Sequence, residues 1–234
     1  VSPGVVEEGA VSRNLKISIA AVVTFVAVIA VALLLSGRSS DTAASSQPQS
    51  SPSSAEGGTA FVRADSHRLS TAPDGKVTLV EFLDFECESC RAAYPSIENL
   101  RQEYAGRVTF VARYFPLPGH FNADNAALAV EAAAQQGKFE AMYKKMYETQ
   151  TEWGEQRVSA APLFRQFAQE MGLDMAKYDA AVASPATLER VRADQRDGEA
   201  LGVQGTPTFF LNGTKITPRS EAEMKAQIDA ALAS

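Results

Sequence analysis

Two cysteines, Cys87 and Cys90, are the residues whose type and spacing indicate chemistry most directly. They are the only cysteines of the chain, and they form one Cys-x-x-Cys pair. Two thiols at this spacing can form and exchange a disulfide, or they can bind a metal ion. The alternatives are a static disulfide and a pair of inert core thiols. The pairing favours redox cycling, because structural disulfide frameworks use more cysteines at scattered positions.

A metal site is poorly supplied with ligands. The chain has two histidines, His67 and His120, and no second cysteine pair. A closed zinc site of Cys and His ligands is therefore not expected, although carboxylates could complete one. We expect no metal and no organic cofactor, with the Cys87–Cys90 disulfide as the redox centre. His120 is expected to be a polar residue at a domain junction, outside the catalytic set.

A buried strand and a helix should position the cysteine pair. Residues 77–85 form a near-continuous apolar run, typical of a strand buried on both faces of a sheet, and residues 87–104 predict a helix. Cys87 then lies at a helix N-terminus, where free N–H groups and the helix dipole lower a thiol pKa. We expect Cys87 to be the exposed nucleophile, and Cys90, one turn deeper, to resolve the mixed disulfide.

Glu81 is an acidic residue inside this apolar run. A buried carboxylate is costly unless it is paired or functional, so a charge at a strand edge is the alternative interpretation. Burial would raise the pKa of Glu81 and allow it to exchange a proton with Cys90.

The segment 77–95 resembles the active-site strand and helix of the thioredoxin superfamily, more specifically those of a DsbA-type thiol-disulfide oxidoreductase. The likeness is carried by Glu81 six residues before Cys87, by Pro95 five residues after Cys90, and by the loop 203–213 with Thr206 before Pro207. It covers roughly residues 61–234.

The resemblance implies roles for the distant loop. Pro207 should follow a cis peptide bond, whereas an ordinary loop proline would be trans. The backbone of Thr206 should then pair with an extended substrate peptide and orient a substrate cysteine toward Cys87. Glu88 and Ser89, the dipeptide between the cysteines, differ from the Pro-His of strongly oxidising DsbA enzymes. A carboxylate at position 88 would disfavour the neighbouring thiolate and make the couple less oxidising.

The remaining globular part predicts an α/β thioredoxin-like fold with an inserted helical domain. Residues 68–70 predict an edge strand, and residues 108–114 a strand parallel to the first, joined to it through the 87–104 helix. Residues 122–200 are helical in pattern, which the resemblance explains as an insertion over about 120–200. A hairpin at 208–217, turning at Asn212-Gly213, and a helix capped by Ser220 should complete the fold.

The N-terminal part predicts a membrane anchor. Residues 17–35 carry no charge, and we expect 17–37 to be a single transmembrane helix, with a cleaved signal peptide as the alternative. Arg13 and Lys16 before it, against Arg38 after it, favour a cytoplasmic segment 1–16. Residues 38–60 predict a flexible, disordered Ser/Pro-rich linker. The domain at 61–234 should therefore lie outside the cytoplasm, where disulfides persist.

Charge and location narrow the expected partners. The net charge of −6 offers no basic footprint for nucleic acid. We expect unfolded or secreted proteins with cysteines as substrates, and a membrane redox partner that resets the pair. The expected function is extracytoplasmic disulfide formation or exchange. A reductase or isomerase of the same fold stays open, since Thr206 resembles isomerase-like relatives, as does, more remotely, a metal-carrying or redox-silent binding module.

Overall fold

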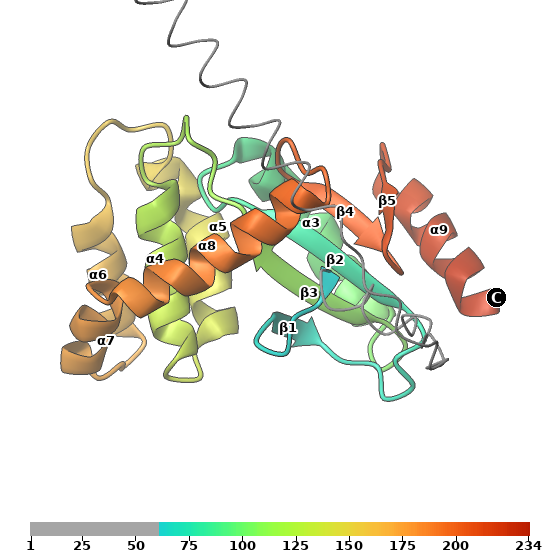
Figure 1. The fold of residues 1–234 in the computed structure, drawn as a ribbon, viewed down its shortest axis with the longest axis horizontal. Coiled ribbons are helices and arrows are strands. Elements are labelled where there is room, and N and C mark those ends of the chain that lie inside the picture. Colours follow the sequence, from blue (N-terminus) through green and yellow to red (C-terminus); the bar gives the residue numbers. More distant parts are fainter. Residues whose placement is uncertain (1–60) are drawn as a thin grey trace, which may run out of the picture. The chain divides into compact units, whose positions relative to one another are not determined.

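A computed structural model describes residues 61–234 of the chain. Its sheet has the strand order β1-β3-β2-β4-β5 (Figure 1). The strands are β1 (His67–Ser70), β2 (Thr78–Leu83), β3 (Thr109–Tyr114), β4 (Thr208–Leu211) and β5 (Thr214–Ile216). The predicted α/β thioredoxin-like core, with its edge strand, is confirmed.

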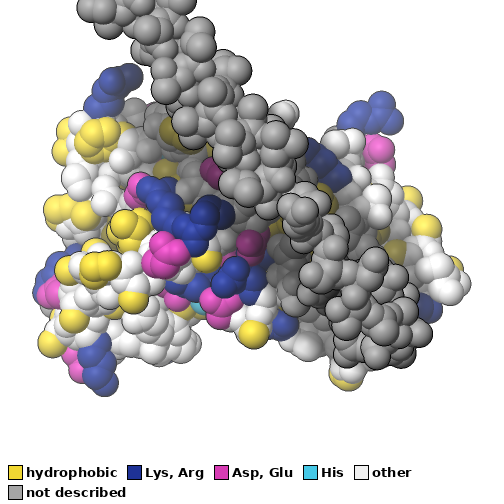
Figure 2. Space-filling view, in the orientation of Figure 1, with side chains coloured by type: hydrophobic (Ala, Val, Ile, Leu, Met, Phe, Trp, Pro, Cys, Tyr) yellow, Lys and Arg dark blue, Asp and Glu magenta, His cyan; other side chains and the backbone are white. Residues whose placement is uncertain are grey.

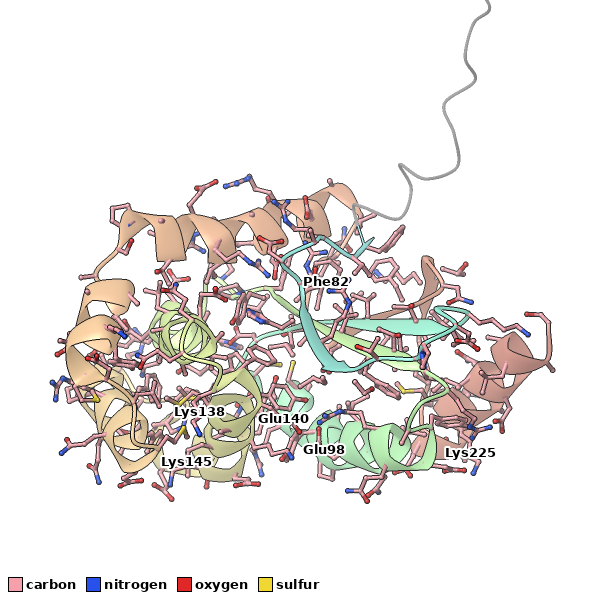
Figure 3. All side chains as sticks on the ribbon, turned by 90° about the horizontal axis from the view of Figure 1, so that it is seen from below. Phe82, Glu98, Lys138, Glu140, Lys145 and Lys225 are labelled. Atoms are coloured by element: carbon pink, nitrogen blue, oxygen red, sulfur yellow. The ribbon has the colours of Figure 1, made fainter. Side chains whose placement is uncertain are left out.

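The central strands β2 and β3 are parallel and in register from Thr78 opposite Thr109 to Leu83 opposite Tyr114. Helix α3 (Glu88–Glu103) forms the crossover between them, as predicted. All six residues of β3 and five of the six in β2 are buried, because the sheet is covered on both faces. Figure 3 shows α8 (Pro185–Ala200) on one side of the sheet, and α3 with α9 (Glu221–Ala233) on the other.

The predicted helical insertion lies between β3 and β4. Its helices within the described residues are α4 (Ala123–Ala134), α5 (Phe139–Trp153), α6 (Ala161–Glu170), α7 (Met175–Val182) and α8. Asp174 and Ser184 cap the N-termini of α7 and α8 by accepting backbone N–H bonds. Asn122, the N-cap residue of α4, makes no side-chain cap bond and instead binds backbone groups of the 156–160 segment.

Helix α8 returns the chain from the insertion to the sheet and packs closely against it. A side chain at Gly198 would put its first carbon 2.7 Å from the Phe115 ring and 3.0 Å from that of Phe82. Glycine therefore permits this approach. A small apolar cluster forms on this face of the sheet, from Val80, Phe82, Val111, Phe115, Val203 and Phe210.

The C-terminal hairpin and helix follow the prediction. Strand β4 pairs antiparallel with both β2 and β5. Asn212 and Gly213 both have positive φ, 48° and 79°, as a type I′ turn requires. The hydroxyl of Ser220 accepts the Glu223 N–H at 3.2 Å and so caps α9.

Basic and acidic side chains lie next to each other along α8 on the face seen in Figure 2. Arg192 binds Asp124 at 2.6 Å and Arg190 binds Asp65 at 3.0 Å. The charges at these positions are therefore matched in pairs.

The predicted N-terminal segment 1–16, membrane anchor 17–37 and linker 38–60 lie outside the described residues. Within 61–234, no helix is both long and apolar enough to cross a bilayer.

Candidate functional site

Both cysteines lie at the start of α3, where β2 leads into the helix. Cys87 is the N-cap residue and Cys90 lies in the first turn. Both are free thiols. Cys87 is 6% exposed and Cys90 is fully buried. The order of depth is the predicted one, but the expectation of an exposed Cys87 is wrong, because the loop before β4 lies against its sulfur atom.

The surroundings of Cys87 favour its thiolate and lower its pKa to about 5. The largest cause is a hydrogen bond from the Cys90 thiol. Contact with Thr206 and the backbone N–H groups of Cys90 and Ser89 act in the same direction, and burial opposes them. Glu88 is exposed. The expected destabilisation of the thiolate by Glu88 is therefore outweighed, because water screens an exposed charge.

Cys90 is affected in the opposite direction. Burial is the main reason that its pKa is raised well above the ordinary value, and the neighbouring Cys87 and Glu81 raise it further. One thiol of the pair is thus ionised at neutral pH, while the other keeps its proton. Such a pair has a ready nucleophile and a second thiol that needs a base.

Glu81 is the acidic residue that can exchange a proton with Cys90. It lies in β2, is 6% exposed and has its pKa raised to about 8, first by burial and then by the charges of Cys87 and Glu98. Its carboxylate makes no side-chain hydrogen bond or ion pair with residues 61–234. Its charge in turn contributes to the raised pKa values of Cys90, Tyr143 and Tyr147. The hydroxyls of both tyrosines are buried and have no hydrogen-bond partner among residues 61–234.

The distant loop 203–213 reaches the cysteine pair, as the resemblance implies. The Thr206–Pro207 peptide bond is cis. Cys87 Sγ lies 3.3 Å from the Thr206 carbonyl oxygen, to which it donates a hydrogen bond while it is protonated. Strand pairing explains the meeting, because Phe82 near the end of β2 lies opposite Thr208 at the start of antiparallel β4.

Gln150 is a site residue that sequence reasoning missed. It projects from α5 and is 2% exposed. Its amide donates to the Phe85 carbonyl at 2.7 Å and to the Cys87 carbonyl at 3.0 Å, and its oxygen accepts from Arg91 at 3.1 Å. The insertion thereby holds the turn that carries the nucleophile. No sequence signal distinguishes this residue from other helical glutamines.

A buried carboxylate pair immediately before Cys87 was also missed. Asp84 accepts the Glu86 N–H at 2.8 Å and the Leu117 N–H at 2.9 Å, and it binds His120 Nδ1 at 2.7 Å. Glu86 accepts the N–H groups of Asn122 and of Glu155. The available signal was the polar residues at 84 and 86 on either side of an apolar Phe85.

His120, which was expected to be only a polar residue at a domain junction, also binds a buried carboxylate next to the cysteine pair. Burial alone would lower its pKa, but Asp84, followed by the charges of Cys87 and Glu86, raises it. The structure brings His120 to the same corner of the molecule as the N-terminus of α3.

The comparisons with known proteins agree with this geometry. Residues 67–230 match the family described as thioredoxin. The chain is 36% identical over 148 residues to the Na+/H+ antiporter NhaA 1 of Mycobacterium sp. strain KMS, and 36% over 143 residues to the NhaA of Herminiimonas arsenicoxydans. Each match covers 61% of this chain but only 23% and 22% of those longer proteins.

Solved structures give the same fold. A thioredoxin-like oxidoreductase of Silicibacter pomeroyi DSS-3 is 26% identical, with a TM-score of 0.63 over 75% of this chain and 97% of that one. The alpha-DsbA1 of Wolbachia pipientis has a TM-score of 0.67 at 16% identity, over 76% and 96%. Oxidised BdbD of Bacillus subtilis has 0.64 at 23%, over 70% and 92%.

The fold of residues 61–234 is thus that of DsbA-type thiol-disulfide oxidoreductases, which confirms the resemblance read from the sequence. With the family match over most of the globular part and the cysteine pair at its helix N-terminus, the chain belongs to the thioredoxin family.

Proposed function

We propose that this chain is an extracytoplasmic thiol-disulfide oxidoreductase that forms disulfides in other proteins through Cys87 and Cys90. The proposal rests on the pKa values of the two thiols, which are shifted in opposite directions. The pKa of Cys87 is about 5, whereas that of Cys90 is raised. A stabilised thiolate in the reduced pair favours reduction of the enzyme, and so favours oxidation of its substrate.

The reaction starts from the Cys87–Cys90 disulfide. A substrate thiolate attacks Cys87 Sγ, the bond between the two enzyme sulfurs breaks, and Cys90 leaves as a thiolate that takes a proton from Glu81. A second substrate thiolate then attacks the substrate sulfur of the mixed disulfide and releases the Cys87 thiolate. Two electrons pass from the substrate dithiol to the enzyme pair, without a metal or organic cofactor.

Substrate binding is assigned to the loop beside the thiols. The Thr206 backbone offers an extended peptide a strand-like partner next to Cys87. A cavity of about 210 Å³ adjoins it, lined by apolar groups of Ile97, Pro207, Phe209 and Met224. An unfolded protein with an apolar residue near its cysteine fits this surface. The surface does not require a particular amino-acid sequence in the substrate.

The proposed location is the outer side of a membrane, with residues 17–37 as the anchor and a membrane redox partner that reoxidises the pair. Disulfides persist outside the cytosol. The named relatives carry a similar segment within Na+/H+ antiporters, which are membrane proteins. Labelling of reduced Cys87 in intact cells by a membrane-impermeant maleimide tests this location. Labelling only after lysis would contradict it.

The reduction potential of the Cys87/Cys90 couple tests the direction of the reaction. Equilibration with glutathione buffers should give a value near or above about −150 mV for an oxidase. A value near about −270 mV would favour the reductase or isomerase alternative, in line with Thr206 before the cis-proline.

The order of attack is tested with two single variants. Cys90→Ser should accumulate a mixed disulfide with a disulfide-containing peptide, because the Cys87 thiolate attacks the peptide disulfide, one peptide thiolate leaves, and the resolving thiol is missing. Cys87→Ser should form none, and mass spectrometry of the trapped species distinguishes the two. An equal yield of adduct from both variants would contradict the proposed roles.

A further inference from the structure

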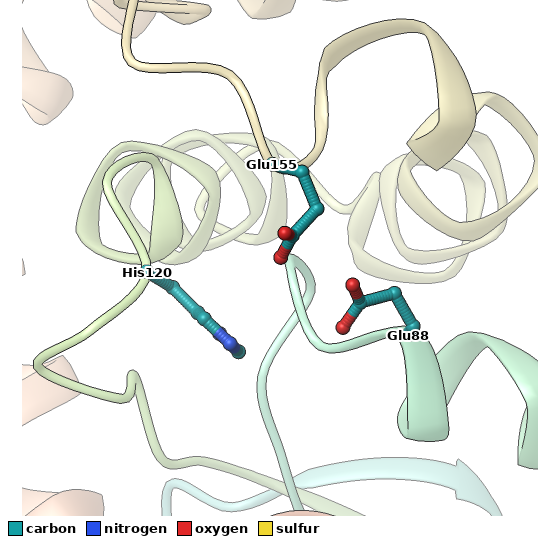
Figure 4. A group of neighbouring side chains, drawn as sticks. All are labelled: Glu88, His120 and Glu155. Atoms are coloured by element: carbon teal, nitrogen blue, oxygen red, sulfur yellow. The ribbon is translucent and has the colours of Figure 1, made fainter.

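Three side chains outside the thiol pair converge beside the N-terminus of α3. Glu88 comes from the first turn of α3, His120 from the loop after β3, and Glu155 from the loop after α5 (Figure 4). One potential ligand atom from each lies within 4.8 Å of the other two. No metal site is expected from the sequence, because the chain has only two histidines and no second cysteine pair. These three residues are distant in the chain and meet only through folding.

Neither carboxylate has another partner in the part of the chain that the structure describes. Glu88 makes no side-chain hydrogen bond or ion pair there, and Glu155 uses only its backbone N–H, which binds Glu86 at 3.2 Å. Exposed acids usually point into solvent or toward a basic side chain. These two instead point toward one imidazole (Figure 4).

The imidazole is oriented as a metal ligand would be. Asp84, only 2% exposed, binds His120 Nδ1 at 2.7 Å, and two backbone N–H groups fix the carboxylate in turn. This bond uses Nδ1, and Nε2 makes no hydrogen bond with residues 61–234. A carboxylate that holds one nitrogen of a histidine while the other binds the ion is the common second-shell arrangement of metal sites.

The surroundings leave room for an ion and its water ligands. A cavity of about 320 Å³ adjoins the cluster, and its lining includes Glu86, His120 and Glu155 together with one cationic side chain, Arg157. The buried carboxylate of Glu86 ties the 120 and 155 loops to the segment before Cys87, through the N–H groups of Asn122 and Glu155. The ligand-bearing loops are therefore held by one short stretch of chain.

We propose that Glu88, His120 and Glu155 form a binding site for a divalent transition metal ion of the zinc type, with water at the open positions. One imidazole and two carboxylates match the ligand preference of zinc and its neighbours, whereas calcium takes oxygen ligands only. The proposed site uses neither thiol as a ligand and does not depend on the proposed redox function.

Zinc titration of the full chain in its oxidised form tests the proposal, because the disulfide removes both thiols as ligands. Calorimetry should show one Zn²⁺ per chain, and the fluorescence of Trp153, two residues before Glu155, provides a second readout. His120→Asn should weaken Zn²⁺ binding at least tenfold, and Glu88→Gln and Glu155→Gln should each weaken it. Asp84→Asn, which touches no ion, should weaken it about 10- to 100-fold.

Glu152→Gln provides the matched control, since Glu152 is exposed on α5 close to the site and makes no side-chain contact with the cluster. Its Zn²⁺ affinity should equal that of the parent chain. Circular dichroism separates loss of binding from loss of folding, and a Cys87→Ser/Cys90→Ser chain should bind as the oxidised form does. Absence of binding at millimolar Zn²⁺, unchanged affinity in His120→Asn, or equal affinity for Ca²⁺ would overturn the proposal.

Discussion

At the scale of single residues, the two sulfurs differ because one is surrounded by hydrogen-bond donors and the other by apolar atoms. Cys87 accepts hydrogen bonds from the Cys90 thiol and from two backbone N–H groups, whereas Cys90 is buried and is influenced by the charge of Glu81. Donors stabilise the charged form of a thiol and burial stabilises the neutral form. Two sulfur atoms at the start of one helix can therefore perform different steps of an exchange reaction.

The lowered pKa of Cys87 can be measured directly. The rate of iodoacetamide alkylation of the reduced chain should follow a single titration with a midpoint at about 5. Cys90→Ala removes the largest cause of the shift, so it should move the midpoint upward. A midpoint near the ordinary thiol value in the parent chain would contradict the thiolate that the proposed function needs.

Glu81 gives a second prediction at this scale, in the pH dependence of stability. Its pKa is raised from 4.5 to about 8, so between these values the folded chain keeps a proton that the unfolded chain has lost. Stability should therefore fall as pH rises through this window. At pH 7 the penalty is about 3 kcal/mol. Glu81→Gln should recover up to that amount at pH 7 and almost nothing at pH 4.

Urea unfolding of the oxidised chain between pH 4 and 9 measures this effect. The disulfide removes the charge of Cys87, but burial, the largest cause of the raised pKa, remains. The oxidised form is required because the lowered pKa of Cys87 gives the opposite slope in the reduced form: a thiolate contributes stability that is lost as pH falls from about 9 to about 5. A constant difference between Glu81→Gln and the parent chain at every pH would show that the carboxyl does not titrate in this range.

At the scale of elements, helix α5 supports the active-site turn through one side chain. Gln150→Leu removes the donor of two hydrogen bonds to the carbonyls of Phe85 and Cys87. We expect a loss of about 1–3 kcal/mol in the free energy of unfolding, because a buried carbonyl loses a partner. The alkylation midpoint of Cys87 should also rise, as the turn loosens. The neighbouring exposed Thr151→Ala should change neither quantity.

At the scale of the whole domain, one buried cation joins the sheet to the insertion. Arg113 of β3 is fully buried and binds Asp194 of α8 at 2.7 Å and Asp197 at 2.6 Å. Asp194 also accepts the Tyr114 N–H at 3.1 Å. These bonds connect the central sheet directly to the last helix of the insertion. The two parts are therefore expected to unfold together.

Arg113→Met tests this link. The variant removes the fully buried cation, while Asp194 keeps its ion pair with Arg190 at 2.7 Å and Asp197 keeps its ion pair with Arg63 at 3.2 Å. We therefore expect a loss of about 1–3 kcal/mol in the free energy of unfolding. Arg165→Met removes the exposed pair with Asp179 and should have little effect on the same urea curve. A urea curve for Arg113→Met that coincides with that of the parent chain would contradict the link.

The sequence predicted those parts of the domain that depend on local pattern. The apolar run to Phe85, the turn at Asn212-Gly213 and the cap at Ser220 each reflect a short-range physical preference, so their positions could be inferred. The links of Gln150, His120 and Asp84 depend instead on how the insertion packs against the sheet. No spacing in the sequence encodes that packing, and the site residues it creates were therefore missed.

The separation of Cys87 from Thr206 by 119 positions has a consequence for biosynthesis. A ribosome releases the cysteine pair long before the segment that forms β4, which pairs with β2 only after the insertion has been made. Until then the nascent polypeptide carries a sulfhydryl that lacks its final neighbour. The emerging chain should thus carry a weaker nucleophile, and full reactivity should arrive only after residues 203–213 have been made.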